Sequence, residues 1–158
     1  MFNMQLRITK HSDKPNTLLY ERDDGTETWM GADEFFVRHD LSHYALEKSL
    51  GYTTAFMGML NKGMEVKDFE DRQKRKSLLL TDEAVYAENM ANLFLMELVQ
   101  GEVPDFNVLV AEAFVRMGTA YPPPRLTPGQ LSRIRNLLRR LLEEWRRLPT
   151  GQTMSLLF

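Results

Sequence analysis

Apolar and polar positions alternate with a period of two near the start of the chain. The segment 4–8 (MQLRI) shows this alternation, which is typical of a strand with one buried face. Two further extended segments, 17–22 and 26–30, flank an Asp-Asp-Gly sequence at 23–25, a hairpin signal because glycine tolerates a positive φ. We therefore predict a three-stranded antiparallel meander over residues 4–30.

After this region the apolar positions recur every three or four residues, the period of amphipathic helices. Capping residues and terminal glycines delimit five predicted helices, over 33–50, 53–61, 81–100, 105–117 and 130–148. The helix over 81–100 is apolar around most of its circumference, so we expect it to be the most buried. Together with the meander, these helices predict an α+β fold.

The length and composition indicate one globular domain. The chain has 158 residues, of which 43% are hydrophobic and 27% are charged, values that suffice for a proper core. We expect a single domain over 1–158, with the strand meander at 4–30 and the helical part at 33–148. The tail 152–158 is a candidate for one more strand of the N-terminal sheet.

Two of the three histidines lie four residues apart on the helix predicted over 33–50. His39, His43 and Glu47 form one stripe of this helix, because positions i, i+4 and i+8 lie along the same face. A helical projection places both imidazoles on the apolar side, where polar groups need partners. The opposite face is expected to meet solvent and carries Glu34, Arg38, Ser42, Ala45 and Ser49.

The sequence HDLSH at 39–43 resembles the HExxH motif of zincin-type metalloproteins, with aspartate in place of glutamate. The resemblance covers these five residues alone. It implies His39 and His43 as zinc ligands and Asp40 as the catalytic base that accepts a proton from a metal-bound water. Aspartate is one methylene shorter than glutamate, which puts the reach of Asp40 to such a water in doubt.

The identity of a third metal ligand stays open in the sequence. Glu47 is on the histidine stripe, but eight residues separate it from His39, about 12 Å along a helix axis. Both side chains would have to bend toward His43 to meet one ion, and an equally good role for Glu47 is to orient His43. Glu83 and Glu88 on a later helix are the other candidates.

These observations support two functional hypotheses. The first is a divalent-metal-binding protein, with zinc or another transition metal held by His39, His43 and Glu47 and with hydrolysis as the reaction class. The second is a non-enzymatic interaction module or homodimer, in which the histidines form a structural network with carboxylates and the helix 130–148 is a basic docking surface. The sequence leaves open whether any catalysis occurs and names no substrate.

Charge and composition limit the partners. The formal net charge is −2, and we do not expect nucleic-acid binding, although seven arginines lie between residues 125 and 148. That basic helix suits an acidic protein partner, a second copy of the chain, or the acidic remainder of the fold. The chain contains no cysteine, which excludes thiolate ligands.

No stretch in the sequence reaches the roughly 18 apolar residues that a membrane span needs. We therefore expect no membrane contact and a cytoplasmic location. The basic run at 72–76 (RQKRK) is expected to be a solvated loop.

Overall fold

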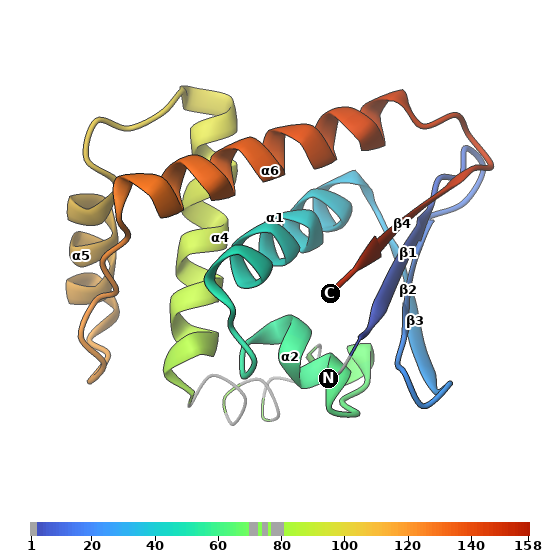
Figure 1. The fold of residues 1–158 in the computed structure, drawn as a ribbon, viewed down its shortest axis with the longest axis horizontal. Helices are drawn as coiled ribbons and strands as arrows, with labels where there is room; N and C mark the ends of the chain where they lie inside the picture. The colour runs from blue at the N-terminus through green and yellow to red at the C-terminus, as the bar shows by residue number, and fades with distance from the viewer. Residues whose placement is uncertain (1–2, 70–72, 74–75, 77–80) are drawn as a thin grey trace.

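The computed structural model describes residues 3–69, 73, 76 and 81–158. Helices lie on one side of a four-stranded antiparallel sheet (Figure 1), which confirms the predicted α+β fold. The elements in chain order are β1 (Gln5–Thr9), β2 (Asn16–Glu21), β3 (Glu27–Ala32), α1 (Glu34–Leu50), α2 (Phe56–Asn61), the 3-10 helix η1 (Val66–Phe69), α4 (Asp82–Gln100), α5 (Phe106–Met117), α6 (Pro128–Arg147) and β4 (Thr153–Leu157).

The sheet joins the two ends of the chain, with strand order β3-β2-β1-β4. The predicted meander is confirmed, and the tail adds β4 to the free edge of β1, where Leu6 pairs with Tyr20 on one side and with Leu156 on the other. The side chains that point toward the helices are buried, as the period of two predicts. They include Leu6, Ile8, Leu18 and Tyr20.

The central helix of the fold is α1, not α4 as we expected from the apolar circumference of the latter. Every residue from Asp40 to Glu47 is buried, because α4, α6 and the sheet surround this stretch (Figure 1). On α4, by contrast, Leu98 and Val99 are exposed. The sequence pattern of one helix does not reveal how many neighbours it has, and this number decides burial.

The predicted solvent face of α1 is therefore wrong in its middle part. Ser42 and Ala45 are completely or almost completely buried, and the hydroxyl of Ser42 donates to the carbonyl oxygen of Ala91 on α4, 3.0 Å away. Small side chains allow two helices to approach closely. The same face is exposed at its first turns, where Glu34 and Arg38 lie.

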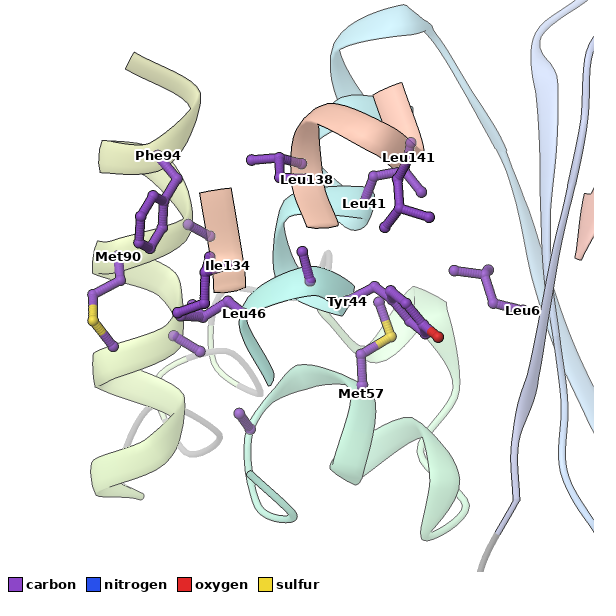
Figure 2. Packing of buried hydrophobic residues seen from close by; sticks show 14 of the residues in the cluster. Leu6, Leu41, Tyr44, Leu46, Met57, Met90, Phe94, Ile134, Leu138 and Leu141 are labelled. Carbon is purple, nitrogen blue, oxygen red and sulfur yellow. The ribbon is translucent and has the colours of Figure 1, made fainter. Parts of the chain in front are cut away.

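The hydrophobic core fills the space between α1, α4 and α6. In Figure 2, Leu41 of α1 lies toward Leu138 and Leu141 of α6, and Leu46 of α1 lies beside Ile134 of α6 on the side that faces Met90 of α4. The buried stripe of α6 consists of Ile134, Leu138, Leu141 and Trp145. A capping box begins this helix, since Thr127 and Gln130 bond to each other's backbone.

Several arginines of α6 form ion pairs within the chain. Arg135 contacts Glu97 with an N–O distance of 2.7 Å, and both Arg135 and Arg139 pair with Glu102. Part of the basic face thus meets the acidic remainder of the fold.

Most of the basic run at 72–76 lies outside the described residues. Of the helices that the structure describes, none combines the length and apolar character needed to cross a bilayer.

Candidate metal centre

Two neighbouring helices bring three potential metal ligands together. The spacing of four residues places His39 and His43 on one face of α1, with ring centroids 4.7 Å apart. Glu88 reaches the same point from α4, which packs alongside α1. One ligand atom from each of these three residues lies within 4.8 Å of the other two, so the group could hold a metal ion.

The three side chains converge through specific atoms. The Nε2 atom of His43 lies 3.0 Å from Oε2 of Glu88, and the Nε2 atom of His39 lies 3.6 Å from Oε1 of the same carboxylate. His43 is 2% exposed, whereas the side chain of Glu88 is 37% exposed. The cluster is therefore buried on the α1 side and accessible from the side of Glu88.

Behind His43, a second carboxylate fixes the ring. The Nδ1 atom of His43 donates to Oε2 of Glu47 over 2.9 Å, and the amide N–H of Met57 donates to the other oxygen of Glu47 over 2.8 Å. Glu47 thus lies on the opposite side of the imidazole from Glu88. When one nitrogen of a histidine faces a metal site, a carboxylate on the other nitrogen sets the tautomer and orientation of the ring. This position of Glu47 matches the orienting role that the sequence left open for it.

His39 has a similar neighbour. Its Nδ1 atom lies 3.5 Å from Oδ1 of Asp40, and the hydroxyl of Tyr20 donates to Oδ2 of the same carboxylate. Tyr20 belongs to β2, so the sheet supports the histidine through Asp40. Both oxygens of Asp40 therefore face groups other than the point where His39, His43 and Glu88 converge.

The carboxylates strongly change the protonation of the cluster. Burial alone would lower the pKa of His43, but hydrogen bonds to Glu47 and Glu88 outweigh it and raise the pKa to about 10. Burial likewise opposes the charged form of His39, and the contacts with Asp40 and Glu88 raise its pKa. Burial would raise the pKa of Glu88, but the two histidines lower it well below its ordinary value. Without a metal, the geometry favours imidazolium–carboxylate pairs.

A cavity of about 720 Å³ opens beside the cluster and is lined in part by His39, His43, Asp40 and Glu88. Phe35 and Phe36, which the projection of α1 places on its apolar side, are 59% and 46% exposed and line the same cavity. They are not core residues, because they lie in the first turn of α1, before the buried stretch from Asp40 to Glu47. Phe56 and Phe69 form another part of the wall.

Glu83 lies apart from the cluster. One of its oxygens accepts hydrogen bonds from the amides of Thr53 and Thr54, at 2.8 and 2.9 Å, so it holds the segment before α2. Of the three candidates for a third ligand, Glu88 is the one that the fold brings next to His39 and His43.

Tyr20 and the aromatic wall of the cavity were not predicted from the sequence. The alternation in β2 contained a signal for Tyr20, because it shares the buried face with Leu18. For Phe56 and Phe69, the pattern gave no signal, since their positions depend on how short elements pack.

Comparison with known proteins adds no assignment: no family model, no curated protein and no solved structure matches this chain.

Proposed function

We propose that this protein binds one divalent transition-metal ion through His39, His43 and Glu88. The observation that carries the proposal is the orientation of the two imidazoles. Both Nε2 atoms face the carboxylate of Glu88, while both Nδ1 atoms face buried carboxylates, Asp40 and Glu47. Paired outer carboxylates of this kind typically orient metal-binding histidines.

Zinc is the metal that we propose. Two imidazole nitrogens and one carboxylate oxygen suit zinc, and three protein ligands are typical of catalytic rather than structural zinc sites. Zinc in such a site keeps a position for water and lowers its pKa, which is the chemistry of hydrolysis. The cavity beside Glu88 would give a substrate access to that position. We therefore propose hydrolysis as the reaction class.

Within this proposal, Asp40 is a positioning residue. The zincin resemblance implies that Asp40 is a general base, but its carboxylate is engaged by the hydroxyl of Tyr20 and lies against Nδ1 of His39. These contacts support a role in orienting His39. Glu47 has the same role for His43, and this differs from the direct ligand role that the stripe on α1 suggests.

A metal-free structural network is the competing function for these residues. Its support is that both nitrogens of His43 already have carboxylate partners, at 2.9 and 3.0 Å. An imidazolium ion between Glu47 and Glu88 would link α1 to α4 without a metal. In that case the protein is an interaction module, for which a second copy or an acidic protein remains the expected partner.

Zinc stoichiometry and affinity in matched variants separate the two functions. We expect about one zinc ion per wild-type chain and a loss of tight binding in Glu88→Gln and His43→Ala. His11→Ala and Glu83→Gln are the controls, since His11 contacts Thr17 in the sheet and Glu83 binds backbone amides. Both controls should bind zinc as the wild type does.

Two outcomes would contradict the metal proposal. One is weak zinc binding that is equal in the wild type and in all four variants. The other is a melting temperature of the zinc-incubated protein that a chelator leaves unchanged, because a ligand that binds the folded state stabilises it. Glu88→Gln is the decisive variant, since the side chain of Glu88 is partly exposed and its loss should not prevent folding.

A further inference from the structure

The cavity beside the cluster has the size and the composition of a binding site for a small organic molecule. Its volume of about 720 Å³ lies within the range of roughly 300–1,000 Å³ that is typical of ligand pockets. The wall comes from β3, α1, α2, η1 and α4. A cavity that several elements share is formed by the fold as a whole and does not depend on a single loop.

Aromatic side chains in the cavity wall contact the two histidines. Phe56 contacts Phe69 edge to face, with centroids 4.5 Å apart, and lies 5.3 Å from the ring of His43. Phe35 stacks on His39 at 6.2 Å. An aromatic ligand beside these rings would make contacts of the same kind, and such contacts gain energy beyond the burial of area.

The lining combines apolar side chains with a small number of polar ones. Met30, Met59 and Val66 are among the apolar residues, and three of the polar residues, His39, His43 and Glu88, converge on one point. Phe36 stays 46% exposed at the cavity although most of α1 is buried. Contiguous exposed apolar surface next to convergent polar groups is a feature of binding sites.

We propose that the cavity binds a small aromatic molecule whose single oxygen-donor group faces His39, His43 and Glu88. The aromatic body lies against the phenylalanine and methionine side chains. The oxygen donor completes the coordination of the metal, so this part of the inference rests on the proposed function. Recognition of the aromatic body requires no metal.

Hydroxamates test both parts, because acetohydroxamate and benzohydroxamate share the metal-binding group and differ in the phenyl ring. We expect the zinc-loaded protein to bind benzohydroxamate at least about tenfold more tightly, since a buried ring removes on the order of 100 Å² of apolar surface from water. Carbon-13 labelled methionine methyl groups report the location. The signals of Met30 and Met59 should shift, and those of Met90 and Met154, buried elsewhere in the core, should not.

Two exposed aromatic residues provide matched variants. Phe36→Ala removes part of the cavity wall and should reduce the preference for benzohydroxamate severalfold with zinc affinity unchanged. Trp29→Ala removes a ring that is 65% exposed on β3 and is not part of the cavity wall, so the preference should stay as in the wild type. Equal affinity of zinc-loaded wild type for both hydroxamates would overturn the inference.

Failure of the metal proposal can be recognised separately. If the chain binds no zinc, the oxygen-donor part of the inference falls, and toluene then decides the aromatic part. A shift of the Met30 and Met59 signals with toluene in the metal-free protein would support an aromatic binding site. In a chain that binds no zinc, the absence of any shift at saturating toluene would overturn it.

Discussion

A histidine ring has two nitrogen atoms, and in this chain each nitrogen of His43 faces a carboxylate. Glu47 on the same helix and Glu88 on α4 lie 2.9 and 3.0 Å away. The ring of His39 also contacts the ring of His43, edge to face. In a metal-free chain, a protonated His43 would be stabilised by both carboxylates, so its proton is bound much more tightly in the folded than in the unfolded state.

This difference predicts how the stability of the metal-free protein depends on pH. The folded pKa of His43 is raised from 6.5 to about 10, so its contribution is fully present below pH 6.5 and is lost as the pH rises through about 10. We expect the free energy of unfolding to fall between pH 7 and pH 9.5. One proton contributes at most about 1.4 kcal/mol per pH unit to that slope.

Chemical denaturation with chelator present measures this slope, and His43→Gln is the reference. The variant should be less stable at pH 7 and should show a smaller decline toward pH 9.5, because it has no imidazole at position 43 to deprotonate. The part of the decline that comes from His39, whose pKa is also raised, stays in the variant. The same slope in both proteins would show that His43 is not held as imidazolium. Titration of Tyr20 does not contribute to the slope between pH 7 and pH 9.5, because burial and the contact with Asp40 raise the pKa of Tyr20 above the ordinary value of 10.

The residues of the site could be predicted to different degrees. The spacing of four residues was sufficient to pair His39 with His43, because helical geometry relates them locally. The contact with Glu88 spans 45 residues of sequence, and Glu83 was an equal candidate on the same helix. Only the packing of α4 against α1 separates these two glutamates.

At the scale of elements, helix ends were predicted more successfully than helix surroundings. Asp33 caps the start of α1 and Gly51 ends it with a φ of 70°, which are local effects of side chain and backbone. The neighbours of α1 are not a local property. Ser42 and Ala45 have small side chains, and the sequence alone gave no reason to distinguish a close helix contact from a solvent face.

A substitution at Ala45 tests whether the middle of α1 is buried on this face. It is completely buried on α1, so Ala45→Phe should overpack the core and cost about 1–3 kcal/mol or more. Arg38→Leu is the control on the exposed first part of the same helix and should change stability by less than about 0.5 kcal/mol. Urea denaturation measures both. Similar small effects would mean that Ala45 faces solvent after all.

At the scale of the whole molecule, the C-terminal strand closes the fold. β4 pairs with β1 near the N-terminus, and the hydroxyl of Tyr44 on α1 donates to the carbonyl oxygen of Leu157 over 2.6 Å. The strand therefore links the sheet to the helix that carries His39 and His43. The sequence indicated this strand only as a candidate, because five residues of alternating character can also be an unpaired tail.

The alternation along β4 predicts opposite outcomes for two adjacent residues. Met154 is buried and pairs with Ile8, whereas Ser155 is exposed and pairs with Arg7. Met154→Ala should lower the free energy of unfolding by about 2–5 kcal/mol through a lost core contact, and Ser155→Ala should change it by less than about 0.5 kcal/mol. Urea denaturation followed by circular dichroism measures the difference. If both substitutions had the same small effect, β4 would not be part of the cooperative core, and the support that Leu157 gives to α1 would have to be abandoned as well.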